Sequence, residues 1–425
     1  MPVERGVVKV KNEAKTILLL KSLFGAYYRE NDIPPPPQFS KREFGFMLWD
    51  KEGMIRHKTF YNRTEFLAFL RKNAPKNAYR SAAYYLDPEA QSMEGKGWVG
   101  ADLIFDIDAD HLITSCKEVH DRWICIDCGI RGTGKKPAQC PSCKSTRIDE
   151  VSWICDQCLN SAKEEVFKLL DFLFDDFGIS EKEVKVVYSG HRGYHVHVDS
   201  ETVRELSSDG RREIINYITG TGIKVENLGL IELSADGRKF IIGPDLTSEG
   251  WGKRLVKSII RMFSSSDLED TLRSIGIPER KIKILLANRE RLVDALSSTP
   301  SKWDFLHGIG ISIWEKIALA AIKRMAAQVD EPVSVDVHRL IRLEYSLHGS
   351  TGFKVTPISV TDLERFDPFK DAIVFKGEKE VIFREYCPEF RIGDELFGPY
   401  QQGEKVELPL PAVVFTLAKD VAELP

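Results

Sequence analysis

The chain has 425 residues, of which 43% are hydrophobic and 29% are charged, a balance typical of a soluble protein with a sizeable core. Its 60 basic and 64 acidic residues give a net charge of −4, which excludes a strongly cationic nucleic-acid coat protein but not a local basic cleft. No apolar run approaches the ~18 residues of a membrane span, and the start lacks the apolar stretch of a signal peptide. We therefore expect an intracellular protein of two or three domains.

Helix and strand signals alternate in the N-terminal part of the chain. An apolar stripe predicts a helix over residues 12–30, and the four consecutive prolines at 34–37 predict an extended connector. Residues 43–49 and 54–60 predict a β-hairpin, and residues 64–72 predict a helix.

Strands and helices also alternate in the middle of the chain. Residues 98–108 predict a strand that leads directly into a cysteine-rich stretch. Helical spacing predicts a helix over 161–178, and the strands predicted over 185–189 and 194–198 flank a turn that contains glycine. Residues 202–330 predict a mostly helical lobe, and short helix and strand signals follow to the end of the chain.

Two aspartates share one face of the strand predicted over 98–108. Because side chains alternate along a strand, Asp106 and Asp108 point to the same side as Ile104, with Cα atoms about 6–7 Å apart. Two carboxylates at that spacing can converge on Mg²⁺, which takes oxygen ligands from carboxylates and phosphates. The alternative is a solvated strand end that also includes Asp110.

The turn after residue 188 has an unusual composition. Gly190 and Gly193 allow a tight turn and a close approach of the backbone to a ligand. Four side chains around it offer polar groups, namely Ser189, His191, Arg192 and His195. Since arginine binds phosphate oxygens bidentately, the turn predicts a triphosphate site. The alternative is a hairpin with ordinary strand histidines, and this structural interpretation is favoured for His197.

Seven of the eight cysteines lie between residues 116 and 158, and clustered Cys-x-x-Cys pairs favour metal binding over disulfides. With one histidine, the candidate ligands are Cys116, His120, Cys125, Cys128, Cys140, Cys143, Cys155 and Cys158. Zinc takes four nitrogen or sulfur ligands, so we predict two structural sites. One pairing makes Cys125, Cys128, Cys140 and Cys143 an inner site and the other four an outer site. A pairing of Cys140 and Cys143 with Cys155 and Cys158 has the same eleven-residue gap and stays an alternative.

Taken in order, the Asp-x-Asp strand, the Cys/His knuckle and the Ser-Gly-His-Arg-Gly-Tyr-His turn resemble the small catalytic subunit of archaeal and eukaryotic DNA primases, more closely the archaeal ones. The family's third carboxylate and a later Ser-Leu-His-Gly segment have similar stretches at 336–340 and 346–352. Further similar segments are Arg42-Glu-Phe-Gly-Phe46, Arg56-His57 and Phe366-Asp-Pro-Phe369, so that the resemblance runs from about residue 20 to about residue 415.

The resemblance implies an α+β primase fold, in which mixed sheets are flanked by helices and accompanied by a helical lobe and a zinc-binding module. The catalytic domain is then expected in three segments, 1–115, 159–200 and 331–425. The zinc module would take 116–158 and the helical lobe 201–330.

The resemblance also implies a site for template-directed nucleotidyl transfer. Asp106, Asp108 and Asp336 would be the catalytic residues that hold two Mg²⁺ or Mn²⁺ ions. The incoming triphosphate would be held by Ser189, His191, Arg192, His195 and His348. Glu43 and Arg56 are candidates for binding the initiating nucleotide.

We therefore expect a primase that makes short primers de novo on single-stranded DNA from NTPs or dNTPs. The primase large subunit and the replication machinery are the expected partners, in the cytoplasm at the nucleoid and without a membrane. One alternative is a repair-type polymerase that extends existing ends. Another is a non-catalytic zinc-bearing nucleic-acid-binding subunit, against which the complete set of carboxylates argues, since binding phosphate gains nothing from acidic residues.

Two departures from the family pattern stand out. The family usually has lysine where this chain has Ser350, and Lys354 and Arg342 are candidates to supply the missing charge. The segment 125–143 resembles an insertion, because the family's single knuckle is similar to Cys116, His120, Cys155 and Cys158.

Asp336 has a structural interpretation as well. Val337, Leu340 and Ile341 are spaced like the first turn of an amphipathic helix, for which Asp336 would be the N-cap. The residues alone favour the cap, whereas the resemblance favours a metal ligand.

Overall fold

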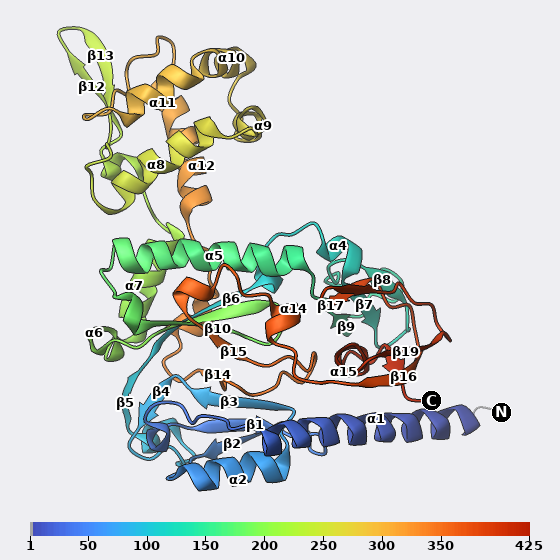
Figure 1. Cartoon of the computed structure of the whole chain (residues 1–425). Helices are drawn as coiled ribbons and strands as arrows, with labels where there is room; N and C mark the ends of the chain where they lie inside the picture. The colour runs from blue at the N-terminus through green and yellow to red at the C-terminus, as the bar shows by residue number, and fades with distance from the viewer. Residues whose placement is uncertain (1–2) are drawn as a thin grey trace. The chain divides into compact units, whose positions relative to one another are not determined.

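The computed structural model describes the backbone of residues 3–425 and the side chains of residues 14–425. Two compact units make up the fold (Figure 1). The first comprises the described residues up to Val166 together with Glu181–Arg211 and Val329–Pro425, and the second comprises Phe167–Ser180 and Arg212–Gln328. No helix among residues 3–425 combines the length and the apolar character that a membrane crossing requires.

A four-stranded antiparallel sheet in the first unit contains the predicted hairpin. Its order is β14-β3-β1-β2, with the strands β14 Leu340–Arg342, β3 Asn77–Ser81, β1 Phe44–Met47 and β2 Met54–Lys58. The helix predicted over 64–72 is α2 (Arg63–Asn73), which begins where the Asn62 side chain accepts the Glu65 N–H. Five phenylalanine rings pack between the hairpin and α2 with centroid distances of 4.5–6.3 Å, namely Phe44, Phe46, Phe60, Phe66 and Phe69.

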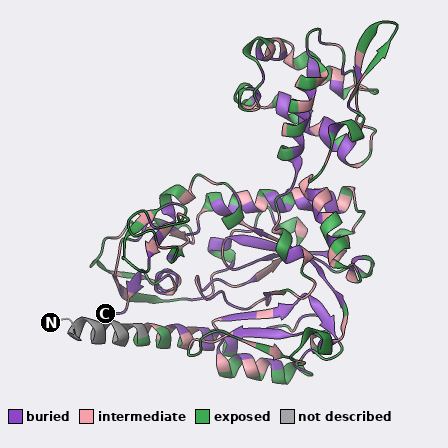
Figure 2. Ribbon diagram, turned by 180° about the vertical axis from the view of Figure 1, so that it is seen from behind, coloured by how far each residue is buried: buried purple, intermediate pink, exposed green. Residues whose placement is uncertain are grey.

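A second four-stranded antiparallel sheet carries the acidic strand and the glycine turn. Its order is β15-β10-β11-β6, with the strands β15 Thr356–Ile358, β10 Val184–Tyr188, β11 Gly193–Val198 and β6 Leu103–Asp108. The predicted pair of strands on either side of the turn is confirmed as β10 and β11. These strands are buried over most of their length (Figure 2). In this register Asp106 lies opposite His195, and Asp108 lies opposite Gly193.

The single strand predicted over 98–108 is in fact two strands. β5 (Trp98–Ala101) pairs with β4 (Ala83–Tyr85), and β6 begins at Leu103 in a different sheet. Asp102 forms the break, because its buried carboxylate accepts hydrogen bonds from Arg42, Arg80 and Tyr84. The polar network at Asp102 thus separates two strands that the alternation of apolar residues predicts as one.

The prediction of a helix that begins at Asp336 is wrong. Asp336 follows the end of α13 (Glu331–Val335), and residues 340–342 form strand β14 instead. Their backbone pairs with Ser81, Arg80 and Tyr79 of β3, so tertiary pairing overrides the local helical spacing. Asp336 still caps a turn, because its Oδ1 accepts the His338 N–H at 2.9 Å.

Smaller elements complete the first unit. A three-stranded sheet of order β8-β7-β9 occupies the cysteine-rich stretch, and another of order β19-β16-β20 lies near the C-terminus. The strands are β7 Arg122–Cys125, β8 Arg131–Thr133, β9 Ile148–Val151, β16 Glu378–Phe383, β17 Phe390–Ile392, β18 Glu395–Phe397, β19 Lys405–Pro409 and β20 Ala422–Glu423. The helices are α1 Val3–Glu30, α3 Met93–Lys96, α4 Lys117–His120, α5 Asp156–Asp175, α6 Glu201–Arg204, α14 Pro368–Asp371 and α15 Leu410–Ala418, of which α5 continues into the second unit.

The second unit is mainly helical. Its helices are α7 Ser208–Thr219 (from Arg212 on), α8 Gly250–Ser264, α9 Leu268–Ser274, α10 Glu279–Ala287, α11 Arg289–Ser297 and α12 Ile311–Met325. The sequence did not reveal its β-hairpin, which pairs β12 (Ile231–Ala235) with β13 (Arg238–Ile242). Trp303 and Trp314 pack edge to face in its core, with ring centroids 5.0 Å apart.

Candidate functional site

Asp106 and Asp108 lie on the edge strand β6 in a setting that disfavours negative charge. His195 Nε2, on the neighbouring strand, is 3.6 Å from Asp106 Oδ1. Burial raises the pKa of Asp106 to about 7, and repulsion from Asp108 and Asp330 adds to this effect. Burial also raises the pKa of Asp108, although the charges of Arg192, His111 and Lys117 oppose the rise. A bound cation would relieve both costs.

The third predicted carboxylate, Asp336, lies directly after the end of α13. It lines a hollow together with Asp102, Ile104, Arg211, Ser334 and Arg339. Among the described residues, only two groups of three or more side chains have all their possible ligand atoms within 4.8 Å of one another. Both groups consist of cysteines, with His120 in one of them. The structure therefore does not gather Asp106, Asp108 and Asp336 to that distance.

Asp330 is an acidic residue near the pair that the sequence analysis did not single out. Its backbone N–H donates to the Asp106 carbonyl at 2.8 Å, and its Oδ2 is 3.7 Å from His111 Nε2. Its charge is one of the causes of the raised pKa of Asp106. No motif marks Asp330 in the sequence, because its place beside β6 arises from the packing of α13.

The glycine turn brings the predicted triphosphate ligands close to a distant segment. Gly190 has a φ of 81°, and a Cβ there would lie 2.7 Å from the Cβ of His348. A Cβ on Gly193 would lie 2.3 Å from the Ile107 carbonyl oxygen, so a side chain would push the turn away from β6. The His191 ring stacks on His348 with centroids 5.0 Å apart and planes 15° apart. Ser189 Oγ accepts the His191 N–H at 3.3 Å.

Arg192 points from this turn into the interior and is only 2% exposed. Its Nη1 donates to both carboxylate oxygens of Asp121, at 2.9 and 2.8 Å, and to the Trp153 carbonyl at 3.1 Å. Its Nη2 donates to Asp110. The predicted phosphate ligand is thus already held by two carboxylates.

Glu43 and Arg56 form an ion pair on the first sheet. Arg56 Nε donates to Glu43 Oε1 at 3.0 Å, and the His57 N–H donates to the same oxygen at 3.1 Å. Burial opposes ionisation of Glu43, but Arg56, the His57 N–H and Lys96 together lower its pKa. Burial raises the pKa of Tyr85, and the charges of Glu43 and Asp336 contribute to this rise, so both carboxylates lie near Tyr85.

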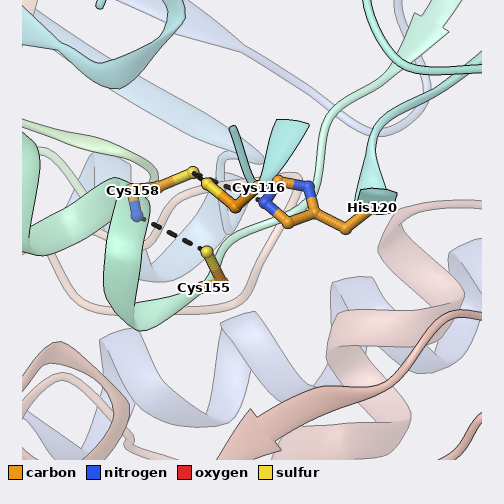
Figure 3. Close-up of side chains that lie close together, drawn as sticks. All are labelled: Cys116, His120, Cys155 and Cys158. Atoms are coloured by element: carbon orange, nitrogen blue, oxygen red, sulfur yellow. Dashed lines mark hydrogen bonds between the residues drawn. The ribbon is translucent and has the colours of Figure 1, made fainter. Parts of the chain in front are cut away.

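Seven cysteines and His120 form two closed groups that can each hold a metal ion. The outer group is Cys116, His120, Cys155 and Cys158, and the inner group is Cys125, Cys128, Cys140 and Cys143. Figure 3 shows the outer group. Cys158 Sγ is 3.5 Å from His120 Nε2 and 3.3 Å from Cys116 Sγ. The alternative pairing of Cys140 and Cys143 with Cys155 and Cys158 is not formed.

Comparison with known proteins identifies the family. The model of the DNA primase small subunit matches residues 149–360. A protein of Methanothrix thermoacetophila named DNA primase small subunit PriS is 36% identical over 97% of this chain and 100% of its own length. Proteins of the same name from Methanocella arvoryzae and Halorubrum lacusprofundi are 33% and 34% identical, over 86% and 83% of this chain and 88% and 84% of their own. The chain belongs to the DNA primase small subunit family.

Membership of the primase family confirms the resemblance drawn from the motifs, and the mixed sheets and helices agree with the α+β class expected from it. The primase relatives cover nearly all of the chain, including the parts outside residues 149–360. The roles of individual residues stay predictions.

Around Ser350, the position at which the resemblance led us to expect lysine, three basic side chains act on His348. Arg342 Nη2 is 2.8 Å from His348 Nε2, and Asn77 Oδ1 accepts from both Arg342 and the Gly349 N–H. Burial lowers the pKa of His348 well below its usual value, and the charges of Arg342, Lys419 and Lys76 add to this effect. Of the two residues that the sequence suggested as a source of the missing charge, Arg342 is therefore the one in contact with His348. The sequence analysis missed Lys76 and Lys419 because both lie far from His348 along the chain.

Proposed function

We propose that this chain is the catalytic subunit of a DNA primase and makes short primers de novo on single-stranded DNA. The observation that carries the proposal is the half-buried Asp106–Asp108 pair, which lies beside His195 and the glycine turn in a chain of the primase family. Electrostatics supports the proposal as well, because a divalent cation would stabilise the charged forms of two neighbouring carboxylates whose pKa values are raised.

Asp106 and Asp108 would hold Mg²⁺ or Mn²⁺, with Asp336 completing the set from the end of α13. Bound divalent ions would activate the attacking 3′-hydroxyl and neutralise the leaving pyrophosphate. His195 Nε2 lies next to this proposed metal site, 3.6 Å from Asp106 Oδ1.

The incoming triphosphate would bind along the turn, through Ser189, His191, Arg192, His195 and His348. Neutral histidines suit this role as hydrogen-bond donors, since burial lowers the pKa of His191 and His348 well below the usual value. The permanent positive charge is left to Arg192 and Arg342. Glu43 and Arg56 would bind the initiating nucleotide.

Both cysteine groups would hold zinc. Thiolate and imidazole donors in sets of four suit a tetrahedral Zn²⁺ ion, and with every position taken by protein both sites would be structural. Residues of the inserted inner group lie in β7 and in the loops of the sheet β8-β7-β9, where Cys125 and Cys140 pack with Trp123 and Ile148.

The primase large subunit would be the partner that stabilises the first nucleotide, because de novo synthesis lacks the stacking help of a primer. The substrates would be the single-stranded template and NTPs or dNTPs. Action in the cytoplasm at the nucleoid, together with the replication machinery, belongs to the same proposal.

Primer synthesis on single-stranded DNA, with labelled NTPs and dNTPs and with or without the large subunit, tests the function. We expect short products without any primer, and their loss in Asp106→Asn and Asp108→Asn proteins that keep the wild-type circular dichroism spectrum. Activity that requires an existing 3′ end would instead identify a repair-type polymerase. Template binding without nucleotide addition would identify a non-catalytic subunit.

A further inference from the structure

Asp121 has a buried carboxylate that contacts both the outer group of candidate metal ligands and the glycine turn, through His120 and Arg192. It directly follows the candidate ligand His120 and is 1% exposed. Its Oδ1 is 2.8 Å from His120 Nδ1 and accepts the Trp153 N–H at 2.9 Å. Both of its oxygens also accept from Arg192 Nη1, at 2.9 and 2.8 Å.

On the metal side, Asp121 determines which ring nitrogen of His120 is available. With Nδ1 bound to Asp121, Nε2 faces the sulfur atoms and lies 3.5 Å from Cys158 Sγ (Figure 3). A carboxylate in this position fixes the tautomer and orientation of a metal-binding imidazole.

On the nucleotide side, the two carboxylates that hold Arg192 differ in exposure. The Asp121 side chain is 2% exposed, whereas that of Asp110 is 43% exposed. A phosphate group arriving from solvent can replace Asp110 on Nη2 but cannot reach Nη1, which Asp121 and the Trp153 carbonyl cover. Asp121 is therefore the permanent anchor of the guanidinium.

We propose that Asp121 is a positioning residue that couples the outer metal site to triphosphate binding, by holding His120 and Arg192 with one carboxylate. The inference rests on the proposed function, because it takes Arg192 as a triphosphate ligand. It gives the outer knuckle a role in nucleotide affinity in addition to its role in folding.

The test compares full-length Asp121→Asn with wild type and with Asp176→Asn. Asp176 serves as the control, since it forms a largely buried ion pair with Arg254 at 2.7 Å in the second unit, with side chains 9% and 8% exposed. Three quantities are measured: zinc loss to EDTA, affinity for Mg²⁺-ATP and affinity for single-stranded DNA. In Asp121→Asn we expect faster zinc loss and a roughly 10- to 100-fold weaker affinity for ATP. This is the usual size of the effect when a residue that hydrogen-bonds to a metal ligand is replaced. DNA affinity should be retained.

Cys116→Ser provides a second route that leaves Asp121 intact. Opening the outer site in this way should weaken ATP binding, whereas Cys387→Ser, which changes a buried cysteine outside both groups, should not. Wild-type ATP affinity in either Asp121→Asn or Cys116→Ser would overturn the coupling, and so would an equal loss in Asp176→Asn. A wild-type protein that does not bind ATP at all would instead refute the proposed function.

Discussion

At the scale of single residues, the charge state of Asp106 depends on what occupies the space beside β6. Burial and the neighbouring carboxylates raise its pKa to about 7, so without a cation the folded protein still holds this proton at pH values where an unfolded chain has lost it. A divalent ion must displace the proton in order to bind.

We therefore predict that the apparent affinity for Mn²⁺ rises by about tenfold per pH unit below pH 7 and levels off above it, as linkage to one proton requires. Calorimetric titration between pH 5.5 and pH 8 measures this slope. Asp106→Asn should reduce it to what the raised pKa of Asp108 still causes, while Asp50→Asn, which removes an exposed carboxylate, should keep it unchanged. An affinity independent of pH in the wild type would show that Asp106 does not bind the metal.

Arg342 is the basic residue in contact with His348, two residues before Ser350, where the resemblance led us to expect lysine. Its guanidinium lies over the Tyr79 ring at 4.8 Å, and its charge opposes the raised pKa values of Asp106 and Asp108. One arginine thus acts on both the predicted metal ligands and the predicted triphosphate ligands.

We predict that Arg342→Ala raises the KM for NTPs by roughly 10- to 100-fold, the effect of losing one hydrogen bond to a charged group. Lys354→Ala is the comparison, since Lys354 was the other candidate. Steady-state kinetics with a fixed template gives both values. The opposite ranking, with Lys354→Ala the more damaging change, would assign the missing charge to Lys354.

At the scale of elements, the segment that carries the inner ligand group begins and ends at residues that are in contact with each other. The Trp153 N–H donates to Asp121 Oδ1 at 2.9 Å, so the two ends of the segment between them are already adjacent. Inside the segment, β7, β8 and β9 pair only with one another among the described strands.

Replacement of residues 122–152 by a short Gly/Ser linker should therefore leave a folded protein with one zinc ion in place of two. Elemental analysis gives the metal content, and nucleotide addition should persist because neither group keeps an open coordination position. The expected loss of stability is limited to contacts of the removed segment, such as the Arg131–Glu385 ion pair. A deletion variant without zinc would mean that the outer group needs ligands from the inner one.

Sequence patterns were informative where local chemistry and structure coincide. The hairpin β1–β2, the strands β10 and β11 and the two ligand groups each depend on residues that are close in sequence or on a strict spacing. The break at Asp102 and strand β14 were missed because both depend on distant partners. Asp330, Lys76 and Lys419 were missed for the same reason, since only packing brings them near Asp106 or His348.

At the scale of the whole molecule, a buried polar network links both four-stranded sheets of the first unit. Arg80 of β3 donates to Glu344 at 3.0 and 2.8 Å and to Asp102 at 3.2 Å, and its Nη2 is 2.9 Å from His197 Nδ1 on β11. Arg42 donates to the same Asp102 carboxylate at 2.8 Å. The structural interpretation of His197 agrees with this contact, which turns the side chain toward Arg80.

The network should make stability depend on pH. Burial opposes ionisation of Glu344, but the charge and hydrogen bonds of Arg80 outweigh it and hold the pKa of Glu344 far below its usual value. A depressed pKa contributes stability that is present above the unfolded-state pKa of about 4.3 and is lost as the pH falls through the folded-state value.

We predict that Glu344→Gln lowers the free energy of unfolding by about 3–5 kcal/mol at pH 7, because it leaves the buried charge of Arg80 under-compensated. Thermal melts at pH 7 and pH 3 measure the difference from wild type, which should shrink at pH 3 because the unfolded wild-type chain takes up a proton on Glu344 there, whereas the folded carboxylate stays ionised. Glu279→Gln, which removes an exposed partner of Arg273, should leave the melting temperature unchanged at both values. A Glu344→Gln protein as stable as wild type at pH 7 would show that Asp102 alone balances Arg80, and that the two sheets are joined by packing and not by charge.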